Sequence, residues 1–201
     1  MRGRILVIGL LAAAVAVVAV VHFARRNTTK PALQPGEVSL VGDSLNLGVE
    51  PYLRTELRRW LIVADDEVGR STATGVEHLK AKGASLAPYV VVSLGTNDPV
   101  ETVDAFRADV AEVLGLAGSN RCVVWATIHR SGDAYEPFNE VLRVAASGHR
   151  SLRLVEWTSM IRAHPDFVAA DGIHGSPSGY QARARAIVDA LRTCPPKQLR
   201  A

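Results

Sequence analysis

Three patterns that mark common active sites are absent from this 201-residue chain. No Gly-x-Ser-x-Gly segment is present, which excludes the nucleophile elbow of the α/β-hydrolases. No Gly-x-Gly-x-x-Gly follows the first predicted strand, so a dinucleotide site lacks its fingerprint. The six histidines are dispersed without metal-ligand spacing. We therefore expect neither a bound metal nor a cofactor.

Acidic residues are absent from the first 30 positions, which hold five of the 23 basic residues. The rest of the chain then has 18 basic against 20 acidic residues, so the basic overall charge belongs to the N-terminal flank. A folded part with a slightly negative balance has no general affinity for a phosphate backbone. Nucleic-acid binding is not expected.

Residues 5–24 contain no charged side chain and one clearly polar one, His22. Twenty helical residues span about 30 Å, the thickness of a bilayer core, so we predict a transmembrane anchor. A cleaved signal peptide, and thus a secreted protein, is the alternative. It is less favoured because bulky His22 stands two positions before Ala24, where a cut would fall. Basic residues flank both sides, so the flanks do not decide the orientation.

The predicted organisation follows from this segment. Residues 1–24 form the anchor, the polar and proline-containing residues 25–36 a tether, residues 37–194 one enzymatic domain, and residues 195–201 a C-terminal tail.

Only two cysteines are present. Cys122 begins an apolar run and Cys194 follows the last predicted helix. A strand start and the end of a returning helix lie at the same edge of an alternating fold, so a disulfide is geometrically reasonable and would require an oxidising compartment. Two unrelated buried thiols explain the pattern equally well.

Short apolar runs alternate with helical patterns after the tether. The predicted strands are 38–41, 61–64, 89–94, 122–128 and 152–157, and the predicted helices are 49–59, 72–82, 103–116, 135–146 and 176–193. Ser176 is the expected N-cap of the last helix, with Pro177 at its first position. This alternation predicts an α/β fold with a five-stranded parallel sheet covered by helices on both faces.

Polar clusters follow these strands where each one ends, and ligand sites of such sheets lie at that edge. Ser44 follows the first strand within Gly-Asp-Ser-Leu, at a helix start that favours a developing negative charge. Serine needs a base, and Asp-Gly-Ile-His at 171–174 offers one. His174 can take the proton while Asp171 holds its ring. Taken singly, an N-cap serine, a turn aspartate and a surface histidine explain these residues as well.

An acyl-transfer site also needs donors aimed at the oxyanion. The Asn97 carboxamide and the backbone N–H groups of Ser44 and Gly69 are the candidates. Helix capping for Asn97 and a tight turn for Gly69 are the alternatives. His129 and Arg130 follow the fourth strand and either line the pocket or lie in an exposed loop, which we favour slightly. Arg70 either meets an anionic substrate or is a surface residue.

Together, Ser44, Gly69, Asn97 and His174 resemble the four signature residues of the SGNH/GDSL hydrolases, in order. The matching segments are VGDSLNLG, EVGRS, VSLGTND and DGIHGSPSGY, and the likeness covers residues 37–194. The resemblance implies a flavodoxin-like three-layer α/β/α sandwich. It further implies Ser44 as nucleophile, His174 as base, Asp171 as orienting partner, and an oxyanion hole of Ser44, Gly69 and Asn97.

The leading hypothesis is a serine esterase acting on short acyl esters, including acylated cell-surface glycans, in a shallow and open pocket. One alternative is an acyltransferase that moves the acyl group to a glycan hydroxyl. The domain resembles the SGNH domains that accompany membrane acyltransferases, so a membrane acyltransferase partner would supply the acyl group. The other alternative is a non-catalytic, membrane-tethered binding module. The catalytic domain is expected outside the cytoplasm.

Overall fold

The computed structural model describes residues 33–130 and 134–194. Its strands are β1 (Glu37–Gly42), β2 (Leu61–Asp66), β3 (Tyr89–Ser93), β4 (Cys122–Ala126) and β5 (Leu152–Val155). They form one parallel sheet in the order β2-β1-β3-β4-β5. This is the flavodoxin-like order, and it confirms the predicted five-stranded parallel sheet.

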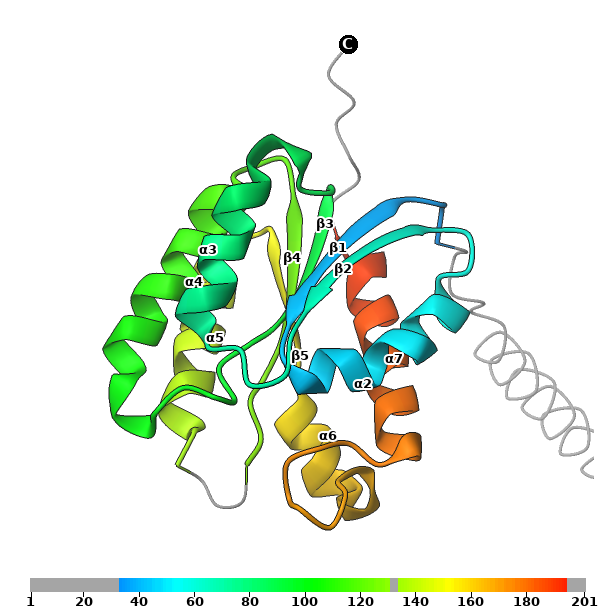
Figure 1. Cartoon of the computed structure of the whole chain (residues 1–201), viewed down its shortest axis with the longest axis vertical. Coiled ribbons are helices and arrows are strands. Elements are labelled where there is room, and N and C mark those ends of the chain that lie inside the picture. Colours follow the sequence, from blue (N-terminus) through cyan, green and yellow to red (C-terminus); the bar gives the residue numbers. More distant parts are fainter. Residues whose placement is uncertain (1–32, 131–133, 195–201) are drawn as a thin grey trace, which may run out of the picture. The chain divides into compact units, whose positions relative to one another are not determined.

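Helices cover both faces of the sheet (Figure 1). On one face lie α3 (Thr72–Lys82), α4 (Val103–Ala117) and α5 (Glu136–Gly148), and on the other α2 (Ser44–Glu56) and α7 (Pro177–Arg192). The short helix α6 (Trp157–Ala163) lies beyond the carboxyl ends of the strands. Three 3₁₀ turns complete the described elements: η1 (Gly83–Ser85), η2 (Val100–Thr102) and η3 (Pro165–Phe167).

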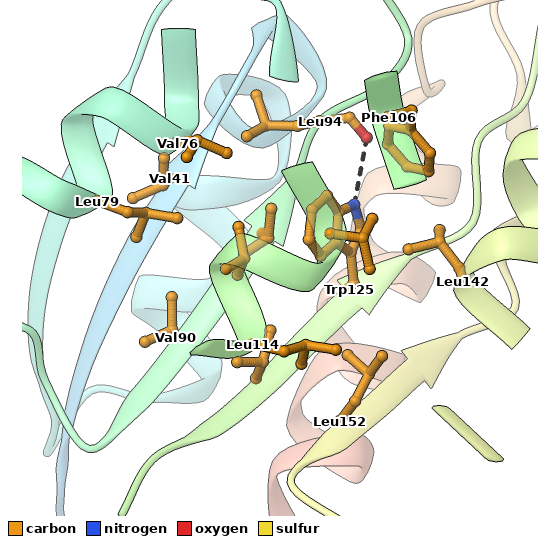
Figure 2. Close-up of a cluster of buried hydrophobic side chains, with 14 of the residues drawn as sticks. Val41, Val76, Leu79, Val90, Leu94, Phe106, Leu114, Trp125, Leu142 and Leu152 are labelled. Carbon is orange, nitrogen blue, oxygen red and sulfur yellow. Dashed lines mark hydrogen bonds between the residues drawn. The ribbon is translucent and has the colours of Figure 1, made fainter. Parts of the chain in front are cut away.

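The core beneath α3, α4 and α5 is built from alternate strand residues, because successive side chains of a strand point to opposite faces. Val41, Val90 and Trp125 belong to this cluster and are almost fully buried. Trp125 also donates a hydrogen bond from Nε1 to the carbonyl oxygen of Leu94 at 3.2 Å (Figure 2). This bond satisfies the polar atom that a buried tryptophan carries into the core.

The fourth strand was expected at 122–128 and ends at Ala126, the second was expected at 61–64 and reaches Asp66, and two further differences have a clear physical reason. The helix after β1 was expected at 49–59 but begins at Ser44. The buried Asp43 carboxylate accepts a hydrogen bond from the Leu45 N–H and so starts the helix at Ser44 rather than at residue 49. The fifth strand was expected to reach Trp157 but ends at Val155, and Trp157 instead begins α6, which the prediction missed. The Trp157 side chain is fully buried, so the apolar pattern at this residue did not distinguish strand from helix.

The strand register places three carboxyl ends level with one another. Gly42 at the end of β1 lies opposite Asp66 of β2 and Ser93 of β3. The loops that follow these strands therefore leave the sheet side by side, which brings distant parts of the sequence to one edge.

Cys122 and Cys194 form a disulfide, with their Cα atoms 5.9 Å apart. The bond joins the start of β4 to the residues just after α7. The sequence left open whether these cysteines form a disulfide or are two unrelated buried thiols, and the structure has the disulfide.

The predicted membrane segment at residues 5–24 and the predicted tail at residues 195–201 lie outside the described residues, as does most of the tether. Within residues 33–130 and 134–194, none of the helices has the length and hydrophobicity needed to cross a bilayer.

Candidate active site

Ser44 is the first residue of α2 and lies directly after the buried Gly42 and Asp43 of the β1 end. Its side chain is only partly buried, and its Oγ lies 2.9 Å from Nε2 of His174, 130 residues away in sequence. Within the described chain, no residue accepts a hydrogen bond from the Ser44 amide N–H. The serine thus presents both its hydroxyl and its amide at the start of a helix, where anions are stabilised.

Asp171 and His174 lie in the loop before α7. Nδ1 of His174 is 2.7 Å from Oδ2 of Asp171. The other carboxylate oxygen accepts the backbone N–H groups of Ile173 and His174, both at 2.9 Å. Gly172 has a φ of +72°, which turns the chain tightly enough for these contacts. The structure therefore brings together Ser44, His174 and Asp171.

The hydrogen bonds of Asp171 fix its charge. The Ile173 N–H, the His174 side chain and the His174 N–H lower the pKa of this carboxyl to about 2. An ionised carboxylate only accepts hydrogen bonds, so the proton between the two residues belongs to Nδ1 of His174. In the neutral ring Nε2 then carries the lone pair and accepts the Ser44 hydroxyl, as a general base must.

Asn97 lies in the loop after β3, where Gly95 adopts a φ of +109°. Its Nδ2 donates to Oδ2 of Asp43 at 3.1 Å and to the carbonyl oxygen of Arg70 at 3.2 Å. Both amide protons are thus engaged within the protein. The amide is thus held between Asp43, which precedes Ser44, and Arg70, which follows Gly69.

Gly69 occupies the turn between β2 and α3 with a φ of +77°. A residue with a side chain is strained at this φ, which explains why glycine occurs here. In the part of the chain that the structure describes, no group accepts a hydrogen bond from the Gly69 N–H. Ser44 and Gly69 therefore offer two available backbone donors, whereas the Asn97 donors would have to exchange a partner.

Asp43 is a residue whose role the sequence analysis missed. Its side chain is fully buried. One oxygen accepts the Leu45 N–H at 2.9 Å and the other accepts Asn97 Nδ2, so this carboxylate links the nucleophile helix to the candidate oxyanion donor. Burial raises the pKa of Asp43, whereas the hydrogen bond from the Leu45 N–H and the charge of Arg183 act to lower this pKa.

Arg183 of α7 is the second missed residue, because its sequence position looks like any basic residue in a helix. It is 2% exposed and donates from Nη2 to Ser93 Oγ at 2.7 Å. Its guanidinium lies over the Trp157 ring, 5.2 Å from the ring centre. Burial lowers its pKa to about 10, so it remains charged at neutral pH. A buried positive charge thus lies at the end of β3, where it acts on the Asp43 carboxylate.

Arg70 is not a surface residue, so that interpretation of it was wrong. It is 5% exposed, and its guanidinium donates to the carbonyl oxygen and the side chain of Asp65. The ion pair keeps a buried charge partnered, as burial requires.

A hollow of about 340 Å³ is lined by Val100, Arg130, Tyr135, Asp171 and Ile173, so Asp171 is the candidate catalytic residue that faces it. His129 and Arg130 are half-buried and line pockets, so the exposed-loop reading that we favoured was wrong for them. Within residues 33–130 and 134–194, no group of three His, Cys, Asp or Glu side chains could hold a metal ion.

Comparison with solved structures identifies the fold. The C-terminal catalytic domain of Streptococcus pneumoniae peptidoglycan O-acetyltransferase A, solved with a methylsulfonyl adduct, superposes with a TM-score of 0.67 at 20% identity, over 81% of this chain and 95% of that domain. A lipase/acylhydrolase from Enterococcus faecalis gives 0.69 at 20% identity, over 81% and 99%. A lipolytic protein of the G-D-S-L family from Veillonella parvula gives 0.66 at 16% identity, over 79% and 98%.

The domain has the SGNH/GDSL hydrolase fold. The resemblance seen in the sequence is thereby confirmed at the level of fold, including its three-layer arrangement. Levels of identity this low establish the fold alone.

The two relatives compared by sequence are both named as O-acetyltransferases. A peptidoglycan O-acetyltransferase of Listeria monocytogenes is 29% identical over 149 residues, which is 71% of this chain and 22% of the relative. An O-acetyltransferase of Staphylococcus aureus is 27% identical over 157 residues, or 77% and 25%. The chain thus spans about a quarter of the length of these relatives. No family model matches the chain.

Proposed function

We propose that this domain is a serine-dependent acyl-transfer enzyme that acts on acylated glycans of the cell surface. The observation that carries the proposal is the hydrogen-bonded series from Ser44 Oγ through His174 to Asp171. A hydroxyl, a base and an ionised carboxylate in this arrangement are the components of nucleophilic catalysis by serine.

The geometry suits a two-step reaction. Ser44 Oγ attacks the acyl carbonyl while Nε2 of His174 takes its proton. The N–H groups of Ser44 and Gly69 would stabilise the oxyanion, together with Asn97 once one of its amide protons leaves its present acceptor. When the tetrahedral intermediate collapses, His174 returns the proton to the leaving oxygen and the acyl group stays on Ser44.

The second step decides between the two candidate activities. Attack by water would make the domain an esterase, which the sequence analysis put first. Attack by a glycan hydroxyl would make it a transferase, and the names of the relatives favour this alternative. The same triad serves both, because His174 can deprotonate either nucleophile.

The proposed location is outside the cytoplasm, with residues 5–24 as the membrane anchor. The Cys122–Cys194 disulfide supports it, because such bonds persist in oxidising compartments. In the transferase case, a membrane acyltransferase partner is our proposal for the source of the acyl group.

The first test is labelling of the chain with a fluorophosphonate probe, followed by mass spectrometry. We expect a single adduct on Ser44 that is absent in Ser44→Ala and retained in the matched control Ser85→Ala, whose serine is exposed and remote from the site. The absence of an adduct on folded protein would overturn the proposal and favour the non-catalytic binding module.

The second test separates esterase from transferase by product analysis. The enzyme is given a small acetyl ester with and without an oligosaccharide acceptor. Acetylated sugar that depends on Ser44 would establish transfer. Free acetate at the same rate in both reactions, with no acetylated sugar, would establish hydrolysis.

A further inference from the structure

The sheet ends in two edge strands, β2 and β5, and the outer side of β5 is already used within the chain. Because Val123 of β4 donates its N–H to the carbonyl oxygen of Ser151, the backbone groups of Leu152 point away from β4. The Leu152 N–H donates to the carbonyl oxygen of His149 at 3.0 Å, and the Leu152 carbonyl oxygen accepts Nη1 of Arg153 at 2.9 Å. This edge is therefore closed to another strand.

The backbone of β2 is used on one side only. The Leu61 N–H donates to the carbonyl oxygen of Gly36 at 3.0 Å, so alternate residues from Leu61 onward face β1. The residues between them, Ile62 and Ala64, point their N–H and carbonyl groups to the outer side. Among the residues that the structure describes, none takes up these outward groups. The β2 edge is thus an unpaired strand edge.

This edge also exposes apolar side chains. Leu61 is 60% exposed and Val63 is 39% exposed, and Val68 in the loop after the strand is 73% exposed. Residues 61–64 (LIVA) contain neither a charge nor a proline. Such residues are the devices by which edge strands avoid pairing with other chains. Free backbone groups beside exposed apolar side chains therefore favour the addition of another strand.

The charges at the two ends of β2 indicate which strand fits. Arg58 and Arg59 are exposed just before the strand, and residues 65–67 at its end are all acidic. Neither arginine forms an ion pair within the described part of the chain. Glu67 has a 65% exposed side chain, which lies 3.4 Å from Arg70. A second copy of β2 running antiparallel would place each basic end beside an acidic end, whereas a parallel copy would place like charges together.

We propose that two copies of this chain pair through β2, antiparallel, about a two-fold axis that passes beside Val63. Centring on Val63 pairs all of residues 61–65. Ile62 then lies opposite Ala64 of the second copy, and the outward backbone groups of these two residues exchange hydrogen bonds. Arg59 lies opposite Glu67 of the second copy. The two five-stranded sheets become one continuous sheet, and the contact closes at two copies because both use the same surface.

The first test uses the register. Both native cysteines are held in the disulfide, so Val63→Cys carries the only free thiol. Residues facing each other beside the axis in this register have Cα atoms about 4.5 Å apart, which a disulfide can span. We expect the full chain in detergent to form a disulfide-linked dimer under mild oxidation, seen by non-reducing electrophoresis. The matched control is Val144→Cys on α5, where the native side chain is 56% exposed. No cross-link in Val63→Cys, or an equal yield in both variants, would overturn the proposal.

The second test measures association without a thiol, by sedimentation equilibrium of the full chain in detergent. We expect the parent to dimerise. Val63→Lys should raise the dissociation constant by roughly tenfold or more, because two like charges would then meet at the axis. Val144→Lys should match the parent, and circular dichroism checks that both variants are folded. A monomeric parent would overturn the proposal. So would a dimer that Val63→Lys leaves intact, because the contact would then lie elsewhere in the chain.

Discussion

At the residue scale, the proposed chemistry depends on two hydrogen bonds to opposite nitrogens of the His174 imidazole. Asp171 fixes the proton on Nδ1 of His174, and Nε2 then faces Ser44. Because the Asp171 carboxylate is held by two backbone N–H groups as well, its position does not depend on the histidine alone.

We expect His174→Ala to lose nearly all activity on an aryl acetate, and Asp171→Asn to lower kcat by roughly 10²- to 10⁴-fold, because the histidine tautomer is no longer fixed. The double variant should be no slower than His174→Ala, since the two residues act as a unit. Steady-state kinetics check this, and independent, multiplicative losses would contradict it.

The pKa of Asp171 leads to a prediction about pH. Since this pKa lies at about 2, Asp171 is ionised throughout the range above about pH 4. Any fall of kcat/KM between pH 5 and 7 must therefore come from another group. Asp171→Asn should lower the rate across this range without removing the acidic limb of the profile. Loss of that limb in the variant would show that Asp171 itself titrates there.

At the scale of elements, residues at the start of α2 and in the middle of α7 hold the candidate site in place. Asp43 caps α2 and holds Asn97, while Arg183 brings a buried positive charge to the same region. Without a compensating positive charge, burial favours the protonated form of a carboxyl group. A protonated Asp43 would have one oxygen less to accept hydrogen bonds from the Leu45 N–H and the Asn97 amide.

We expect Arg183→Met to raise the pKa of Asp43 further, because burial already raises it and Arg183 is a charge that lowers it. The acidic limb of kcat/KM should then move to higher pH, and Arg183→Lys should restore it. The pH profiles are compared on folded variants, checked by circular dichroism. A profile in Arg183→Met that matches the parent would show that Arg183 serves packing alone.

Asp66 at the end of β2 gives a stability prediction. Burial raises its pKa to about 6, although Asn46 donates a 2.7 Å hydrogen bond to it. Its other oxygen is buried without a partner among the described residues. Since the folded-state pKa exceeds the unfolded value, the native state binds the proton more tightly, so stability falls as pH rises from about 4 to about 6.

Asp66→Asn removes the free-energy cost of burying an ionised carboxylate. The substitution should therefore raise the free energy of unfolding by about 2 kcal/mol at pH 7, with little difference at pH 4. Urea denaturation at the two pH values measures both quantities. A variant that is less stable than the parent at pH 7 would mean that the ionised carboxylate is needed there.

At the scale of the whole domain, the disulfide ties the start of β4 to the end of α7 across a sequence separation of 72 residues. Closing a loop of this length restricts the unfolded chain, so the double variant Cys122→Ala/Cys194→Ala should lose about 2–5 kcal/mol of unfolding free energy. Urea denaturation checks this, with the parent under reducing conditions as the control. Equal midpoints for parent and variant in oxidising buffer would show that the bond does not form or does not stabilise.

The sequence determined the sheet and indicated the candidate catalytic residues, because both depend on local patterns. Continuous apolar runs at 89–94 and 122–128 mark strands buried on both faces, and the serine, asparagine and histidine segments follow strand ends in order. Strand and helix could not be separated at Trp157, where a buried aromatic residue suits either.

Only the tertiary structure decided how distant side chains meet. It paired Cys122 with Cys194, buried Arg70 on Asp65, and buried Arg183 against Ser93. It also placed Arg130 in the lining of two pockets. Each outcome depends on strand register and helix packing, which join residues far apart in the chain. A local pattern of residue types carries no record of such distances.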